Sequence, residues 1–157
     1  LSGSSYQQLT LGTITGRPPR IDFDLERRVQ LLVRQAIADG LIASAHDSSD
    51  GGLAVALAEC SIASGFGVEL NFSPGTTSAA RLLFAEGGAR VVVSVKAAQL
   101  TRWTTMLAAN PEVSATVLGA VASHGRFQLS FGAGNTIDLP VEQLQQVYAE
   151  ALPRRLA

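Results

Sequence analysis

The sequence has a single cysteine, Cys60, among its 157 residues. It therefore cannot form an internal disulfide or a metal cage made of several thiolates. A lone cysteine inside the apolar run LAVALAECSIA is typical of a small buried hydrophobic side chain rather than a nucleophile. Such sparing use of cysteine suits a reducing compartment, so we expect a cytoplasmic protein.

Lysine is almost absent too, since Lys96 is the only one. Twelve basic and thirteen acidic residues give a net charge of −1, so the chain lacks the positive field that attracts nucleic acid or anionic lipid. No apolar run reaches the ~18 residues of a membrane span. The first sixteen residues lack the basic start and apolar centre of a secretory signal. We expect neither nucleic acid nor a membrane as a partner.

What the sequence has is enough apolar content, 46% of its residues, to build a core. A chain of this length should bury roughly 70% of the surface it exposes when unfolded. Residues 1–22 are rich in glycine and proline and predict an irregular lead-in, whereas residues 23–157 predict one domain. The chain begins with Leu1 rather than methionine, so we expect a fragment of a longer multidomain chain.

Helical and strand patterns alternate along the chain. Apolar residues at helical spacing begin at Leu25, after Asp22 or Asp24 as a cap, and stop at Gly40. Further helices are predicted at 53–63, at 97–109 and after Pro140, and strands are predicted at 65–72, 90–95, 113–121, 126–131 and 136–139. This order predicts an α/β or α+β fold with a mixed sheet of about four to six strands covered by helices.

Three details of this pattern carry specific expectations. The β-branched run at 90–95 is typical of a central strand covered on both faces. Residues 123–125, Ser-His-Gly, indicate a tight hairpin turn in which His124 is solvated. The last helix is predicted to bury five apolar side chains: Val141, Leu144, Val147, Tyr148 and Leu152.

The densest group of reactive side chains lies between a short apolar segment, residues 41–45, and the helix at 53–63. Its members are His46, Asp47, Ser49, Asp50, Gly51 and Gly52, with Ser48 among them. Glycines allow the backbone to approach a ligand, and a helix start offers free N–H groups to a phosphate. A metal held by His46, Asp47 and Asp50 is a second interpretation.

A structural interpretation explains the same residues. No lysine follows the glycines as in a P-loop, and two aspartates repel a phosphate unless a metal lies between them. Adjacent residues of a strand point to opposite faces, so His46 and Asp47 would not share a metal. In this interpretation Ser49 or Asp50 caps the helix and the two glycines permit tight packing. The residues favour it over the ligand site.

A second glycine-rich turn, formed by Glu86, Gly87 and Gly88, precedes the strand at 90–95. It either faces a ligand or ends a helix before a buried strand, and the residues favour the helix stop. The Gly-x-Ser-x-Gly motif of a nucleophile elbow does not occur in the sequence. We predict no catalytic residue and no metal ligand in this chain.

Four stretches resemble the final domain of the phosphoribosylformylglycinamidine synthase family. SAHDSSDGGLAVALAE is similar to its motif His-Asp-x-Ser-Asp-Gly-Gly-Leu-Ala-x-Ala-Leu-Ala-Glu. LSGSSYQQLTLG is similar to its Gly-Gly-Ser-Glu-Tyr segment, and LLFAEGGARVVVSV to its Leu-Phe-Gly-Glu-Ser-Gln-Ser-Arg-Val-Val-Val-Ser-Val. IDLPVEQLQQVYAEALP is similar to its closing segment. The four stretches span nearly the whole chain, and the resemblance implies the fold of the C-terminal domain shared with AIR synthase.

The resemblance also implies a function for the longer protein. The family converts formylglycinamide ribonucleotide to the amidine with ATP, Mg²⁺ and ammonia derived from glutamine. Its partners are the remaining domains of its own chain, a glutaminase subunit and, in some complexes, a small accessory subunit. A homodimer is left open. The family's catalytic residues lie upstream of this segment, so the fragment alone should be inactive, with a structural role or one at an auxiliary nucleotide site.

This chain departs from the family where ligand contacts are expected. Ser5 stands where the family has glutamate, and Gly87 and Gly88 replace Ser-Gln. Both changes remove polar side chains, so we expect the fragment to hold no cofactor tightly. Two alternatives remain at this point. One is a domain of another AIR synthase-like enzyme, of the selenophosphate synthetase or thiamine monophosphate kinase type. The other is a stand-alone nucleotide-binding or scaffold module.

Overall fold

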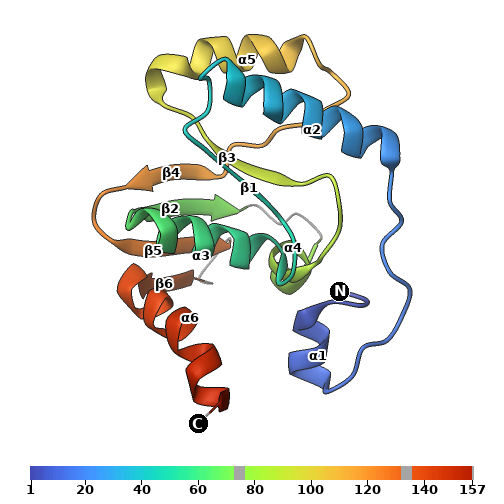
Figure 1. Ribbon diagram of the computed structural model, residues 1–157, viewed down its shortest axis with the longest axis vertical. Helices are drawn as coiled ribbons and strands as arrows, with labels where there is room; N and C mark the ends of the chain where they lie inside the picture. Colours follow the sequence, from blue (N-terminus) through green and yellow to red (C-terminus); the bar gives the residue numbers. More distant parts are fainter. Residues whose placement is uncertain (73–76, 132–135, 157) are drawn as a thin grey trace. The chain divides into compact units, whose positions relative to one another are not determined.

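The computed structural model of the chain describes residues 1–72, 77–131 and 136–156. Its elements form two compact units, one made of Leu1–Ala56 with Leu83–Thr116 and the other of Leu57–Leu82 with Val117–Ala157. No helix within the described ranges is long and apolar enough to cross a membrane. The elements, which Figure 1 labels except for η1, are α1 (Ser5–Leu11), α2 (Phe23–Ala38), β1 (Ser44–Asp47), α3 (Gly52–Ser64), β2 (Gly67–Phe72), α4 (Ala79–Phe84), β3 (Val91–Ser94), η1 (Ala97–Gln99), α5 (Leu100–Ala108), β4 (Gly119–Ala122), β5 (Arg126–Phe131), β6 (Thr136–Pro140) and α6 (Val141–Leu156).

Helix α2 of the first unit begins and ends as its sequence predicts. The side chain of Asp22 accepts a hydrogen bond from the Leu25 N–H at 3.0 Å, which satisfies one of the free donors of the first turn. At the other end Gly40 has a φ of +64°. The N–H of Leu41 bonds the Ala36 carbonyl at 2.9 Å and that of Gly40 bonds the Ile37 carbonyl at 3.0 Å. These two bonds form a Schellman cap, which needs a glycine at this point.

The core of the first unit joins α2, α5 and β3. Its buried members are Leu32, Ala36, Leu41 and Trp103, and its partly buried members are Ile42, Val93, Val95, Met106, Leu107 and Val113. Ala36 has 0% exposure because its small side chain lies where the packing is closest. Each fully buried leucine contributes about 1.5–3 kcal/mol relative to exposure. The helical spacing in the sequence predicted both helices correctly.

The lead-in differs from the expectation of an irregular segment. Residues 5–11 form α1, in which Ser4 accepts a hydrogen bond from Gln7 N–H at 3.2 Å and Gly12, with φ +68°, ends the helix. A stacked pair formed by Tyr6 and Phe84, with ring centroids 4.8 Å apart, fastens it to the unit. Ser4 and Gly12, two residues of the segment predicted to be irregular, supply the two caps of α1. The single domain from residue 23 on stays a prediction.

Strands β1 and β3 form a two-stranded antiparallel sheet in the first unit, with His46 opposite Val92. The run at 90–95 was expected to be a central strand, and this is wrong among the described residues, where β1 is its only neighbour. All four residues of β3 are half-buried. A run of β-branched residues indicates a strand with apolar contacts on both faces. It does not indicate how many other strands pair with that strand.

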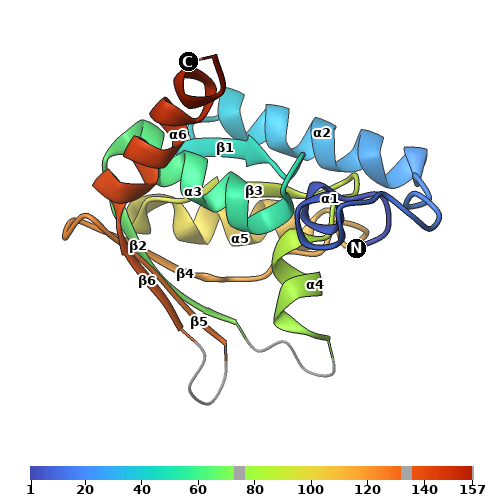
Figure 2. The same cartoon turned by 90° about the horizontal axis from the view of Figure 1, so that it is seen from below.

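The second unit contains a four-stranded mixed sheet in the order β4-β2-β5-β6. Strands β2 and β5 are parallel, and Phe72 lies opposite Phe131 with ring centroids 5.7 Å apart. Alternate residues are buried in both strands, with Leu129 only 1% exposed. In Figures 1 and 2 helix α6 and the part of α3 from residue 57 on lie on the same face of this sheet. The predicted mixed sheet covered by helices is confirmed.

Two expectations for the second unit are wrong. Strands β4 and β5 pair with opposite edges of β2, so residues 123–125 are not a hairpin turn. Helix α6 buries Val141 but leaves Tyr148 63% and Leu152 67% exposed, and Val147 is exposed as well. Helical spacing identifies an apolar stripe, yet it does not tell whether the same chain covers it.

Candidate functional site

The two glycine-rich turns meet in the first unit and line one groove of about 540 Å³. Six of the nine residues singled out from sequence line it: Asp47, Ser49, Asp50, Glu86, Gly87 and Gly88. His46, Gly51 and Gly52 lie beside it and are not part of its lining. The two turns were predicted separately, and the antiparallel pairing of β1 with β3 brings them together because each turn adjoins one strand of that pair.

Glu86 connects three segments at this groove. Its Oε1 atom accepts hydrogen bonds from the backbone N–H of Ser5 and from that of Gly51, each at 2.8 Å. Gly51 immediately precedes α3, so its N–H is one of those that a helix start leaves without an intrahelical acceptor. A carboxylate at this end is stabilised by the helix dipole. The turn at 86–88, the start of α3 and the first residue of α1 are thus joined through one oxygen.

The pKa of Glu86 reflects this arrangement. Burial of the carboxyl acts to raise its pKa, but the hydrogen bonds from Gly51 and Ser5 favour the ionised form and together lower the pKa below the usual 4.5. Glu86 is therefore ionised at neutral pH and acts as a fixed acceptor.

Gly52 lies against the backbone of the segment that carries Glu86. A Cβ atom at this residue would stand 2.8 Å from the Leu83 carbonyl oxygen and 2.9 Å from that of Ala85, and φ is +68°. Helix α3 begins at Gly52, directly after Gly51, and the expected cap by Ser49 or Asp50 stays a prediction. Ser49 contributes its main-chain carbonyl, which accepts from Gly52 N–H at 3.0 Å. Tight packing of the helix start explains the second glycine.

Asp47 and His46 do not converge on a common ligand. The ring Nδ1 of His46 hydrogen-bonds the Asp47 carbonyl oxygen at 2.7 Å, and Asp47 Oδ2 accepts from the Ser49 hydroxyl. That hydroxyl is the main cause that lowers the pKa of the Asp47 carboxyl. Within the described residues no group of three or more His, Cys, Asp or Glu side chains could hold a metal ion. The contacts of His46 and Asp47 therefore give the metal interpretation for His46, Asp47 and Asp50 no support.

A buried hydroxyl adjoins the groove. Ser48 is 6% exposed, and its Oγ has no hydrogen-bond partner among the described residues. Its backbone N–H bonds the Arg90 carbonyl at 2.9 Å, which fixes the end of β1 to the start of β3. An unpaired buried hydroxyl costs about 1–3 kcal/mol.

The residues of this groove do not fit a nucleotide phosphate. Four carboxylates line it, those of Glu26, Asp47, Asp50 and Glu86. Arg90, the basic residue of the lining, donates to the Ala85 carbonyl oxygen. The Gly51 N–H, which the sequence pattern offered to a phosphate, is bonded to Glu86. A phosphate would meet like charge and occupied donors, so we derive no step through a nucleotide here.

Sequence reasoning missed Glu26 and Gln30 as groove residues. Both lie on α2, four positions apart and hence on one helix face, and they are far in sequence from the glycine-rich turns. Gly88 shows why Glu26 belongs there. A Cβ atom at residue 88 would stand 1.8 Å from Glu26 Oε1, so the space open at this glycine is filled by the Glu26 carboxylate.

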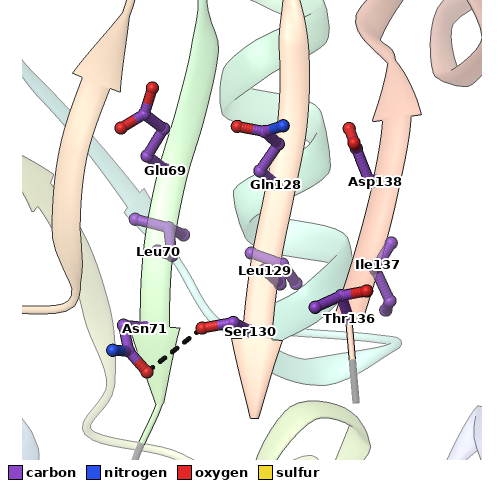
Figure 3. Close-up of a pocket in the computed structure, with 9 residues that line it drawn as sticks. All are labelled: Glu69, Leu70, Asn71, Gln128, Leu129, Ser130, Thr136, Ile137 and Asp138. Atoms are coloured by element: carbon purple, nitrogen blue, oxygen red, sulfur yellow. Dashed lines mark hydrogen bonds between the residues drawn. The ribbon is translucent and has the colours of Figure 1, made fainter. Parts of the chain in front are cut away.

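A second hollow, of about 440 Å³, lies on the polar face of the sheet in the second unit. Figure 3 shows Glu69, Gln128 and Asp138 in one row across three strands and Asn71, Ser130 and Thr136 in the next, on the side away from the helix behind the sheet. The alternation of polar residues along β2 and β5 was the signal that could have identified this face.

The polar face is held by pairs between strands. His124 Nε2 contacts Glu69 Oε1 at 2.8 Å, and the Arg126 N–H donates to His124 Nδ1 at 3.1 Å, so in this tautomer Nε2 carries the hydrogen. Arg126 Nε donates to Asp138 Oδ1 at 2.8 Å. His124 is exposed, as expected, and it links the segment before β5 to Glu69 of β2. Because these pairs are exposed to solvent, they contribute little to the stability of the fold.

The sequence profile of the family "AIR synthase related protein, C-terminal domain" matches residues 1–132. The chain belongs to this family. Its curated relatives include phosphoribosylformylglycinamidine synthase subunit PurL of Synechococcus sp. strain CC9902, 87% identical over the whole chain. The same subunit of Synechococcus sp. strain WH7803 is 60% identical over 99% of the chain. The chain spans about a fifth of the length of these relatives, 20% and 21%.

Solved structures share the fold at much lower identity. The structure of PurLQS from Thermotoga maritima matches 92% of this chain and 25% of its own, with a TM-score of 0.68 and 16% identity. A Thermotoga maritima PurL solved with AMPPCP matches 83% of this chain and 24% of its own, with a TM-score of 0.68 and 17% identity. The expected AIR synthase C-terminal fold is thus confirmed.

Proposed function

We propose that this chain is the C-terminal domain of the ATP-dependent ligase that converts formylglycinamide ribonucleotide to formylglycinamidine ribonucleotide. The observation that carries the proposal is 87% identity over all 157 residues to a PurL subunit of which they make up 20%. No observation favours the selenophosphate synthetase or thiamine monophosphate kinase type.

Within that enzyme the domain supplies structure rather than chemistry. Its glycine-rich turns are filled by its own carboxylates and backbone contacts, and no group of three metal-binding side chains occurs in the described residues. ATP and Mg²⁺ are then bound by other parts of the longer chain. A Thermotoga maritima relative was solved with ATP, which supports nucleotide binding by the whole protein.

The exposed apolar side chains support a role in contact with other domains. Several large ones on helices of both units are more than half exposed: Phe23, Leu31, Ile37, Val147, Tyr148, Leu152 and Leu156. Such residues fit interfaces that are buried in a larger protein. The first partner is the rest of the same polypeptide. The relatives are named as one subunit, so a glutaminase subunit and a small accessory subunit are further partners in this proposal. Cytoplasmic localisation stays a prediction.

Complementation in trans tests the proposal. A synthase subunit truncated before the segment that matches residues 1–157 should have little activity with ammonia as nitrogen donor, and adding the purified chain should restore a measurable part. A matched control is the chain with Tyr148→Asp and Leu152→Asp, which should fold but restore less. No restoration by the unmodified chain, combined with full activity of the truncated subunit, would contradict the proposal and favour a stand-alone module.

A further inference from the structure

Strand β6 is an edge strand with one row of unpaired main-chain groups among the described residues, where β5 is its only neighbour. The N–H of Val141 bonds the Gly125 carbonyl oxygen at 2.9 Å, which sets the phase of the antiparallel ladder between β5 and β6. Because the bonding alternates along such a ladder, the N–H and C=O groups of Thr136 and Asp138 point away from β5. Pro140 has the same phase, so its missing N–H removes no bond to β5. This edge is open to a further strand.

Helix α6 carries an apolar stripe past this edge. Its first residue, Val141, is 5% exposed, whereas Tyr148 and Leu152 are 63% and 67% exposed. These two follow Val141 by seven and eleven residues, so they lie within about 20° of it around the helix axis. In Figure 1 α6 lies beyond β6 on the side away from β5, and Figure 2 shows it on the sheet face that α3 covers. The stripe of Tyr148 and Leu152 therefore lies over the place that a strand next to β6 would take.

We propose that an extended segment of the longer polypeptide, from outside residues 1–157, pairs with the free edge of β6 and is covered by the stripe of Tyr148 and Leu152. A segment of about five residues is enough for such a strand. Its apolar side chains face α6, and its alternate, polar ones continue the polar face beside Thr136 and Asp138 (Figure 3). The inference deepens the proposed function and rests on it for the source of the strand.

The relatives have ample chain to supply this strand, since the 157 residues make up 20% of the PurL subunit of Synechococcus sp. strain CC9902. A segment of the same polypeptide also pairs at a high effective concentration. Charge on an edge strand usually discourages pairing. Here the Asp138 carboxylate is bonded to Arg126 Nε at 2.8 Å on the polar face, so its charge is compensated.

A second copy of the chain fits this edge poorly. If two β6 strands paired antiparallel about a two-fold axis, both α6 helices would lie on the same face of the joint sheet. The two strands would be about 4.8 Å apart, whereas a helix with its side chains is about 10 Å wide. Each α6 extends beyond its own β6, so it would enter the space where the partner's α6 begins. A single extended segment brings no helix and avoids this clash.

Hydrogen exchange, resolved by residue with mass spectrometry, compares the 157-residue chain with a full-length subunit that contains it. In the chain alone the amides of Thr136 and Asp138 should exchange fast, while that of Leu139, in phase with the bonds to β5, is protected. In the full-length subunit Thr136 and Asp138 should exchange at least about tenfold more slowly, because a hydrogen-bonded amide exchanges only when the pair opens. Equal rates in the two proteins, or slow exchange of both amides already in the chain alone, would overturn the proposal.

A proline substitution separates strand pairing from simple covering by α6. Thr136→Pro removes one outward N–H and spares the bonds to β5, because proline is tolerated at the first residue of a strand. Thr136→Ala is the matched control, which loses the side chain and keeps the N–H. When each variant is added to the truncated subunit, Thr136→Pro should restore at least about threefold less activity than Thr136→Ala.

The outcomes of this assay separate the two proposals. Equal restoration by the two folded variants would overturn the strand pairing and leave the proposed function in place. Full activity of the truncated subunit, with no restoration by any form of the chain, would contradict both. If Thr136→Pro does not fold, the exchange rates of the unmodified proteins decide on the strand pairing.

Discussion

Gly52 lies so close to Leu83 that a Cβ atom on the glycine would stand 2.8 Å from the leucine's carbonyl oxygen. The contact is between two backbones, so neither partner can move aside as a flexible side chain would. It fixes the start of α3 against the segment leading to Glu86 and sets the geometry of the groove.

Gly52→Ala should therefore destabilise the protein strongly. The αL conformation costs an alanine about 1–2 kcal/mol, and the backbone clash should bring the total to about 2–4 kcal/mol. Gly65→Ala is the matched control, since φ is +71° there but nothing lies within 4 Å of a Cβ. Gly65→Ala should lower the free energy of unfolding only by the cost of the αL conformation, about 1–2 kcal/mol. Urea unfolding of both variants checks this, and equal losses would refute the packing explanation.

A substitution at Ala89 should stabilise the protein rather than destabilise it. It has a φ of +56°, which is strained for a residue with a Cβ. Ala89→Gly should stabilise the fold by about 0.5–1 kcal/mol, because the relieved strain exceeds the added entropy of the unfolded chain. Ala149→Gly, at an exposed interior position of helix α6, should instead lose about 1 kcal/mol. Thermal unfolding compares the two, and a loss at residue 89 would contradict the inferred strain.

The pKa of Asp138 depends on Arg126. The hydrogen bond from the Arg126 side chain is the largest cause that keeps the pKa of Asp138 below the usual 3.8. A carboxyl with a depressed folded pKa contributes stability above its unfolded pKa and loses that contribution as pH falls through the folded one. Arg126→Gln should therefore raise the pKa of Asp138, measured by carboxyl titration in nuclear magnetic resonance spectra.

A matched control for this titration is Arg28→Gln, which removes an arginine paired with Glu112 in the other unit. It should leave the midpoint of Asp138 in place. If both substitutions shift Asp138 alike, net charge and not the hydrogen bond would set its pKa.

Two leucines of the second unit differ strongly in their exposure to solvent. Leu129 is 1% exposed and Leu152 67% exposed. Leu129→Ala should cost about 2–5 kcal/mol through lost contacts and a cavity, whereas Leu152→Ala should change the free energy of unfolding by less than about 0.5 kcal/mol. Equilibrium unfolding of the isolated chain measures both. A large loss at Leu152 would indicate that α6 is covered, for example by a second copy of the chain.

The sequence predicted local structure well where the signal lies in neighbouring residues. Asp22 before an apolar stripe and Gly40 after it placed α2, and the two glycine-rich turns were located before the structure brought them together. Contacts that depend on distant residues were not predictable. Nothing near Glu86 in sequence indicates that it bonds Gly51, and nothing near Gly88 indicates that Glu26 fills the space above it.

The sequence also did not predict which apolar side chains are buried by other elements of the fold. The apolar stripe of α6 was correctly identified as a stripe, but its exposure depends on what packs against it. The β-branched residues at 90–95 likewise predicted a strand correctly. The prediction that this strand lies at the centre of a sheet was wrong, because among the described residues it pairs only with β1.

We propose that this chain completes a formylglycinamidine synthase without carrying its chemistry. The test is the rate of amidine formation from formylglycinamide ribonucleotide, ATP, Mg²⁺ and ammonia, measured for the chain alone and for the subunit rejoined with it. We predict no product from the chain alone and product from the rejoined subunit. Product formed by the 157-residue chain on its own would contradict this proposal.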